Sequence, residues 1–480
     1  MSVHFTLRQM HSLVYFSNRI SSLTQNQCRE GLDKILTSPR AADPKTPDIV
    51  IGILWQSHRG GTLIRMKRRC VITGMGVVSP NGTGAPAFAE AVLAGRSGVR
   101  RISSFDSSAI PVQIAGEVSG FDELAWVEKK ERKHVSRILP LALCAASEAL
   151  ESAGLTSLPV EERRRFGVII GTGGGSQEFT EEQYRLYFHG QFSKMSLFCV
   201  PTAVMGSISS ELNVRFGLRG PSHVITTGCT SSTDAMGYSM RQIESGRLDM
   251  VLTGGADAPI SLGTVKGFIL MKILTDRWND APEKGSRPFS ADRDGFVLAE
   301  GAWIFVLEEY EHAKARGAKI LAEVCGYGST CEAYHRVRLM ECGEEPARAI
   351  QLAMKQAGIG PENVDYVNLH GTSTQLNDRI ETRALKLALG EVRAREVPMS
   401  ALKSQIGHPQ GACGAAGLAA TIVAMRQGQL PPTINLENPD KECDLDYVPD
   451  AARKKTVGHA VCNCIAFGSK NSALVLRNAG

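Results

Sequence analysis

One cysteine and two histidines, each flanked by small residues, are the side chains in this sequence best suited to chemistry. Cys229 lies in the run TTGCTSS, His370 in LHGTST and His408 in KSQIGH. A thiol is a good nucleophile only as thiolate, and an imidazole can donate or accept a proton near neutral pH. Together the three predict thioester chemistry, in which the thiol holds an acyl group and the two rings act on a second substrate.

Cys229 stands between an expected strand, residues 223–227, and an expected helix, residues 231–244. The positive end of a helix dipole and its unpaired backbone N–H groups favour a thiolate, and the same N–H groups could stabilise the oxyanion of a tetrahedral intermediate. Gly228 permits a strained backbone just before it. Alone, such a cysteine is more often a buried structural thiol, and it is the two histidines that favour the catalytic interpretation.

The two histidines each follow an expected strand and enter a turn with little steric bulk. His370 is followed by GTST, whose hydroxyls could line a polar channel, and His408 lies in GHPQGA. A lone histidine is usually a satisfied core or surface residue, but two in glycine-flanked turns favour a functional site. Lys403, five residues before His408, could stabilise negative charge or orient a carboxylate.

Short buried strands and amphipathic helices alternate from Met66 onward, and this pattern predicts a layered α/β architecture. The reactive residues recur just after strand ends, where open α/β sheets place their chemistry. Strands are expected over 168–171, 223–227, 250–254, 364–369, 397–402 and 460–466, and helices over 139–153, 231–244, 378–389 and 412–426.

The glycine-rich run GTGGGS at 171–176 raises the possibility of a phosphate loop. It lacks the Gly-Lys-Ser/Thr ending of a P-loop, and no acidic residue follows at the spacing of a dinucleotide-binding unit. We therefore interpret it as a tight backbone turn.

Composition indicates an intracellular globular protein without a membrane span. Of 480 residues, 43% are hydrophobic, and no apolar run approaches the roughly 18 residues needed to cross a bilayer. The twelve cysteines lack framework spacing, which indicates reduced thiols and a cytoplasmic location. Cys462 and Cys464 form the only close pair, which is weak support for a metal site, so no metal is expected.

The net charge of +5 does not indicate nucleic-acid binding, because it is concentrated at the N-terminus. Residues 1–65 hold eight Lys/Arg and four Asp/Glu, so they contribute +4, and no basic stripe follows. We expect residues 1–65 to be an extension: a disordered tail or the product of a start codon placed too early. Their arginines, serines and lack of acids before Glu30 also fit a transit peptide, which would place the protein in mitochondria or plastids.

Four motifs together resemble the β-ketoacyl-acyl carrier protein synthases, within them the elongating type II enzymes of fatty-acid synthesis and the type II polyketide ketosynthases. The resemblance covers about residues 67–478. It rests on TGCTS at 227–231, HGTST at 370–374, KSQIGH at 403–408 and Phe467-Gly468, and is supported by GGAD at 254–257, RPF at 287–289, DRDGF at 292–296 and PPTINL at 431–436.

The resemblance implies a thiolase-like fold, in which two similar α/β halves, residues 66–320 and 321–480, form a five-layered α-β-α-β-α arrangement, normally in a homodimer. It implies that Cys229 is the acyl-accepting nucleophile, that His370 and His408 bind the malonyl thioester and assist decarboxylation, and that Lys403 supports them. The division of roles between the histidines stays open.

Further residues receive roles from the same resemblance. Backbone N–H groups of Cys229 and Phe467 would form the oxyanion hole, and Phe467 would also gate the acyl tunnel. Thr372 and Thr374 would contact the pantetheine arm.

The reaction implied is a decarboxylative condensation that extends an acyl chain held on Cys229, with no cofactor required. The partner implied is an acidic acyl carrier protein, so a basic docking patch is expected. Candidates for that patch are Lys130, Arg132 and Lys133, although a solvated helical face explains them equally well.

Two segments depart from the family pattern. After Phe467 the chain reads GSKN, where a glycine-rich ending is usual, and Ala466 stands where glycine is commoner. After AYH at 333–335 comes the basic run RVRLM. Gly228 and the run GADAPI at 255–260 favour the polyketide branch, and housekeeping elongation is the other possibility.

Three alternatives remain at this stage. A thiolase needs a second catalytic cysteine, for which Cys464 is the candidate, but the His408 turn argues against it. An initiating synthase pairs one histidine with an asparagine, whereas both positions here are histidine. The third is the non-catalytic partner subunit of a ketosynthase heterodimer, which loses the nucleophile that Cys229 supplies here, although the altered Phe467 loop keeps that possibility open.

Overall fold

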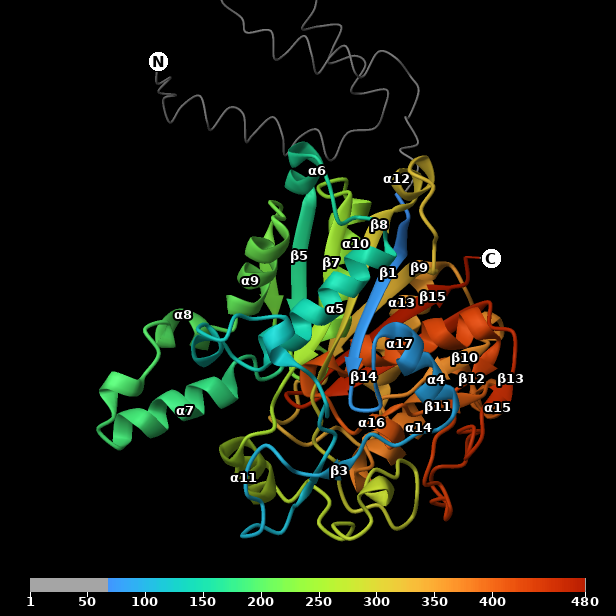
Figure 1. Cartoon of the computed structure of the whole chain (residues 1–480). Coiled ribbons are helices and arrows are strands. Elements are labelled where there is room, and N and C mark those ends of the chain that lie inside the picture. Colours follow the sequence, from blue (N-terminus) through green and yellow to red (C-terminus); the bar gives the residue numbers. More distant parts are fainter. Residues whose placement is uncertain (1–67, 480) are drawn as a thin grey trace, which may run out of the picture. The chain divides into compact units, whose positions relative to one another are not determined.

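The computed structural model describes residues 68–479 (Figure 1). The interpretation of residues 1–65 as an extension or targeting segment lies outside the described residues. Within the described part, no helix combines the length and apolar character that a membrane crossing requires.

Two halves of the described chain repeat one sheet topology. In each half the first strand pairs antiparallel with the last, which pairs antiparallel with a central strand, and two parallel strands complete the order. In the first half these are β1 (Cys70–Ser79), β8 (Gly301–Glu309), β7 (Met250–Asp257), β5 (Phe166–Gly171) and β6 (Ser222–Ile225). In the second half they are β9 (Ala322–Cys331), β15 (Lys470–Arg477), β14 (His459–Ala466), β10 (Tyr366–Asn368) and β11 (Met399–Ser400).

A short ladder between β1 and β9 joins the two halves into one continuous sheet. Both strands carry a Gly-x-Gly pattern, and a helix lies directly on those glycines. A Cβ atom at Gly76 would lie 1.9 Å from the carbonyl oxygen of Ala145, and one at Gly328 would lie 2.0 Å from that of Ala349. The two halves therefore share this detail as well: in each, a helix packs directly on the glycines of the first strand.

Helices occupy three layers around the two half-sheets (Figure 1). α10 (Ser231–Glu244) and α17 (Cys413–Gln427) contact each other and strands of both halves, so they form the middle layer. α5 (Ile138–Ser152) and α9 (Ser207–Phe216) cover the first half-sheet, and α13 (Glu344–Ala357) packs on the second beside α14 (Gln375–Leu389). The predicted thiolase-like, five-layered fold of two similar halves is confirmed.

The middle-layer helix α17 is almost entirely inside the protein. Thirteen of its fifteen residues are buried, in the sequence CGAAGLAATIVAMRQ. Small side chains allow sheets to approach it from both sides, because each alanine or glycine occupies little volume. Its N-terminus and that of α10 consequently lie close together in the interior.

The predicted elements are present, with shifts of a few residues at their ends. α10 has the predicted bounds, whereas β6 stops at Ile225 because Thr227 turns toward the next helix. There the N–H of Thr227 donates to Ser231 Oγ at 2.9 Å, and its hydroxyl donates to Asp234. β11 is shorter than predicted because it pairs with β10 alone, at the sheet edge.

The remaining helices and strands are mostly short. They are β2 (Gly82–Thr83), α4 (Ala85–Leu93), β3 (Arg100–Arg101), β4 (Ile114–Ala115), α6 (Val160–Arg164), α7 (Gln177–Phe188), α8 (Cys199–Ala203), α11 (Leu262–Leu270), α12 (Tyr310–Ala315), α15 (Glu391–Glu396), α16 (Lys403–Ile406), β12 (Gln429–Leu430) and β13 (Arg453–Lys454).

Candidate active site

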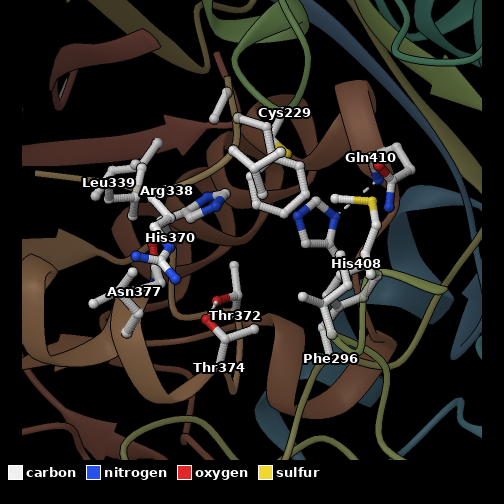
Figure 2. Close-up of a pocket in the computed structure, with 17 residues that line it drawn as sticks. Cys229, Phe296, Arg338, Leu339, His370, Thr372, Thr374, Asn377, His408 and Gln410 are labelled. Carbon is white, nitrogen blue, oxygen red and sulfur yellow. Dashed lines mark hydrogen bonds between the residues drawn. The ribbon is translucent and has the colours of Figure 1, made fainter. Parts of the chain in front are cut away.

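Turns at the ends of both half-sheets bring one thiol and two imidazoles together (Figure 2). Cys229 comes from the β6–α10 turn, His370 follows β10, and His408 precedes α17. The Cys229 sulfur and one ring nitrogen of each histidine all lie within 4.8 Å of one another. The two rings are perpendicular, with centroids 5.6 Å apart. All three residues line a cavity of about 270 Å³.

The Cys229 thiol is buried before α10 begins. Gly228, with φ of 75°, makes the turn that a residue with a side chain would resist. Burial raises the pKa of the thiol to about 12, because lost hydration outweighs the positive charge of Lys403 and the N–H of Phe467. Burial therefore opposes the thiolate that the helix terminus favours.

Two backbone N–H groups stand beside the sulfur. The N–H of Phe467 faces the Cys229 thiol and lowers its pKa. Among the described residues, neither this N–H nor that of Cys229 donates to a backbone carbonyl. Free donors next to a nucleophile can receive the negative oxygen of a tetrahedral intermediate.

His370 is neutral, and its hydrogen sits on Nε2. The Lys403 ammonium, which only donates, lies 3.3 Å from His370 Nδ1 and donates to the carbonyl oxygen of His370 at 2.5 Å. Burial, then the charge of Lys403 and the neighbouring His408, hold the pKa of His370 well below 6.5. Because Nδ1 accepts from a cation, Nε2 carries the proton.

His408 has the same neutral Nε2–H tautomer, which a different contact fixes. The backbone N–H of Gln410 donates to His408 Nδ1 at 3.0 Å, so its Nε2 also carries the hydrogen. Burial, followed by the charge of Lys403, holds the pKa of His408 well below 6.5. The Phe296 ring packs against the His408 imidazole, with the two ring centroids 5.0 Å apart. The site thus presents two neutral Nε2–H donors near one thiol.

Lys403 is buried at the back of the site, on α16, and is not among the residues that line the cavity. Thr372 and Thr374 line the cavity and share a hydrogen bond of 2.9 Å between their hydroxyls. The predicted catalytic and substrate-binding side chains therefore lie in one place.

Two further thiols lie directly behind the nucleophile. The Cys413 and Cys464 thiols both donate to the carbonyl oxygen of Cys229 at 3.1 Å, and their sulfurs are 3.5 Å apart. Together with His370 these thiols form one set with the ligand types of a soft metal ion, and Cys229 with both histidines forms another. The Lys403 ammonium beside His370 Nδ1 opposes a cation at the first of these sets.

Buried carboxylates that the sequence analysis missed hold the reactive turns. Glu381 accepts the backbone N–H groups of His370 and Gly371, both at 2.7 Å, and Asp378 accepts that of Thr372. Both acids lie on the buried face of α14. The sequence does contain a signal for them: two acids three residues apart on the apolar face of a helix must accept hydrogen bonds from buried donors.

The glycine-rich run at 171–176 is joined to the turn after His408 through the Asp257 carboxylate. Asp257 accepts the N–H groups of Gly173, Gly174 and Gly411 at 2.7, 3.0 and 2.7 Å, as well as the Thr172 hydroxyl. The tight-turn interpretation agrees with this, since the N–H groups that a phosphate would need already bind a protein carboxylate.

The candidate docking residues lie outside the cavity lining. Lys130 pairs with Glu128 at 2.8 Å and Arg132 with Glu123. Lys133 is exposed and, among the described residues, has no ion-pair partner.

Comparison with known proteins decides the family. Residues 67–313 match the beta-ketoacyl synthase N-terminal domain and residues 321–437 match its C-terminal domain. The chain belongs to the beta-ketoacyl synthase family. It is 41% identical over 412 residues to the 3-oxoacyl-[acyl-carrier-protein] synthase 2 of Vibrio cholerae, covering 86% of this chain and 99% of that protein.

Similar relatives come from both fatty-acid and polyketide enzymes. The synthase 2 of Synechocystis is 39% identical over 86% of this chain and 98% of its own length. A beta-ketoacyl synthase structure from Burkholderia phymatum is 34% identical, with a TM-score of 0.79, over 86% of this chain and all of that one. A type II polyketide ketosynthase, solved with its acyl-carrier protein and bound to the hexaketide, is 32% identical, with a TM-score of 0.78 at the same coverage.

The depressed pKa values of the histidines predict the pH dependence of any reaction that needs them neutral. Because both pKa values lie well below 6.5, the rings stay neutral where an ordinary histidine becomes charged. Turnover after Cys229 is loaded should stay level as pH falls to 6.5 and decline only in more acidic buffer. Single-turnover rates across pH measure this, with thermal unfolding at each pH as control, and a decline centred at or above 6.5 contradicts it.

Proposed function

We propose that this protein is a 3-oxoacyl-[acyl carrier protein] synthase that joins a Cys229-bound acyl group to a malonyl unit with loss of carbon dioxide. The observation that supports this best is the pair of neutral Nε2–H donors, on His370 and His408, beside a buried thiol. Two donors converging near one sulfur suit a thioester carbonyl that becomes an enolate.

The first step loads the nucleophile. The Cys229 sulfur loses its proton as it attacks the thioester carbonyl of the acyl carrier. The N–H groups of Cys229 and Phe467 stabilise the oxyanion. Its collapse expels the carrier thiolate, which takes up a proton, and leaves the acyl group on Cys229. Since the thiol has a pKa of about 12, deprotonation accompanies attack.

The second step forms the carbon–carbon bond. The Nε2–H groups of His370 and His408 donate to the thioester carbonyl oxygen of the malonyl carrier and stabilise the enolate that forms when the carboxylate leaves as carbon dioxide. The enolate carbon attacks the acyl carbonyl on Cys229, the carbon–sulfur bond breaks, and the departing Cys229 thiolate takes up a proton from solvent. Lys403 acts through His370 by fixing its neutral tautomer, and Thr372 and Thr374 bind the pantetheine amides.

The alternatives have less support. A thiolase would need Cys464 in the cavity, but it is not among the described lining residues, and burial raises its pKa well above 9.0. A non-catalytic partner subunit would not need a nucleophile, and Cys229 lies within reach of both histidines. The similar proteins include both fatty-acid and polyketide enzymes. The proposal therefore covers elongation in either pathway.

We propose that residues 66–320 and 321–480 are two halves of one catalytic unit, because residues from both form the cavity. Residues 1–65 as an extension, and a cytoplasmic location, stay predictions. The eleven cysteines of the described part are free thiols, which fits a reducing compartment.

We propose a homodimer, with a heterodimer as the alternative. β6 ends the sheet, and Ser222 and His223 on it are exposed. A set of exposed apolar side chains lies on and after α7: Tyr184, Tyr187, Phe188, Phe192, Leu197 and Phe198. An unpaired edge and a large apolar surface are typical of an interface. Light scattering should give about twice 51.8 kDa, and a monomer mass for the purified chain would contradict the homodimer.

We propose that an acidic carrier protein docks on Lys130, Arg132 and Lys133. Lys133→Glu should raise the KM for acyl- and malonyl-carrier alike, by roughly three- to tenfold at low salt, because it replaces attraction by repulsion. Lys319→Glu, at an exposed lysine of the same charge, is the control. Equal effects of the two variants, or no effect of Lys133→Glu, would argue against this docking patch.

Separating the two half-reactions tests the mechanism. His370→Ala should still accept an acyl group on Cys229 but lose condensation by about a hundredfold or more, because one of two enolate donors is gone. Cys229→Ala should load nothing. Intact mass spectrometry reads the loading and product analysis reads the condensation. Acylated Cys229→Ala, or normal product from His370→Ala, would remove the residue concerned from the mechanism.

A further inference from the structure

The cavity wall carries one permanently charged side chain, that of Arg338. The other described lining residues are apolar or uncharged polar, and the two histidines are held neutral. Arg338 is exposed, lines the cavity and lies on the His370 side (Figure 2). Among the described residues, its guanidinium makes no hydrogen bond and no ion pair. The five N–H donors of this guanidinium are therefore unpaired within the described chain.

The backbone of Arg338 is fixed although its side chain is free. The N–H groups of Val337 and Arg338 both donate to His335 Nδ1 at 3.0 Å. His335 is held in turn by Ser469, whose hydroxyl donates to its carbonyl oxygen at 2.9 Å. The N–H of Gly468 donates to the carbonyl oxygen of Arg336 at 3.0 Å. The loop that carries Arg338 is thus tied to the turn that follows Phe467, which lowers the cost of holding a ligand.

A guanidinium with free donors selects carboxylate or phosphate groups, which it binds through two parallel hydrogen bonds. Both carrier-bound substrates of the proposed reaction have a phosphodiester at the far end of the pantetheine arm. Only the malonyl group brings a carboxylate to the thioester end, where His370 and His408 lie. A cavity-lining cation on the His370 side therefore favours the carboxylate over the phosphate.

We propose that Arg338 is a specificity-determining binding residue that recognises the carboxylate of the malonyl unit before it is lost as carbon dioxide. This rests on the proposed condensation. Since the guanidinium is exposed, the pair is weak enough to break when the carboxylate departs. Arg338 then contributes to binding of the malonyl carrier rather than to the chemical step. It distinguishes malonyl-loaded carrier protein from carrier protein loaded with an acyl group that lacks the carboxylate.

The test separates the two half-reactions in the full-length protein. Arg338→Gln should raise the KM for malonyl-carrier about tenfold, leave the kcat of condensation within about twofold, and leave the KM for acyl loading unchanged. Arg338→Lys should recover part of the loss, because it restores charge without the planar fork. Arg336→Gln is the matched control, since its side chain is exposed, of the same type, and absent from the cavity wall.

Each other outcome overturns the assignment in a distinguishable way. Equal rises in both KM values would assign Arg338 to the phosphate, and malonyl-pantetheine, which has no phosphate, would then show no defect with Arg338→Gln. If Arg336→Gln changed the KM values as much as Arg338→Gln, the effect would come from the net charge of the loop and not from Arg338 itself. No change in any KM would exclude the role. Failure of the proposed function itself is separate, because the unmodified protein would then form no condensation product.

Discussion

The contact between the Lys403 ammonium and His370 is the interaction on which the site depends. A buried cation needs acceptors, and Lys403 finds one in the carbonyl oxygen of His370. The same ammonium then faces His370 Nδ1, which fixes the tautomer, and its charge lowers the pKa of both histidines. Burial and this charge together keep both rings neutral, and the N–H of Gln410 fixes the tautomer of His408 as Lys403 fixes that of His370.

Such an arrangement requires rigid turns, because a rotated imidazole would lose the Lys403 contact. The turns are held from behind by carboxylates: Glu381 for His370, and Asp257 for the residues after His408. Burial raises the pKa of each acid, while the backbone N–H groups that it accepts lower it. The middle layer, α10 and α17, brings these turns together because their N-termini meet between the two half-sheets. The layered fold is therefore what lets distant turns share one small cavity.

Much of this could be predicted from the sequence, and the part that could not has a physical reason. Periodicity and turn residues predicted α10 to the residue, and small-residue motifs predicted which thiol and which histidines meet. The effect of burial on the Cys229 thiol could not be predicted, because a helix terminus is visible in sequence whereas the loss of hydration around a sulfur is not. The roles of Glu381 and Asp257 were missed because each binds a turn that follows a different strand. The thiols of Cys413 and Cys464 meet across 51 residues of chain, and no local pattern marks that contact.

The two segments that depart from the family pattern prove to be neighbours in space. Ser469, which stands in the altered turn after Phe467, binds the loop that carries the basic run at 336–338. Ser469 has a φ of 64°, so the turn accepts backbone strain in order to make these contacts. These hydrogen bonds join the two segments. Substitutions in the two segments should therefore be interpreted as changes to one structural unit.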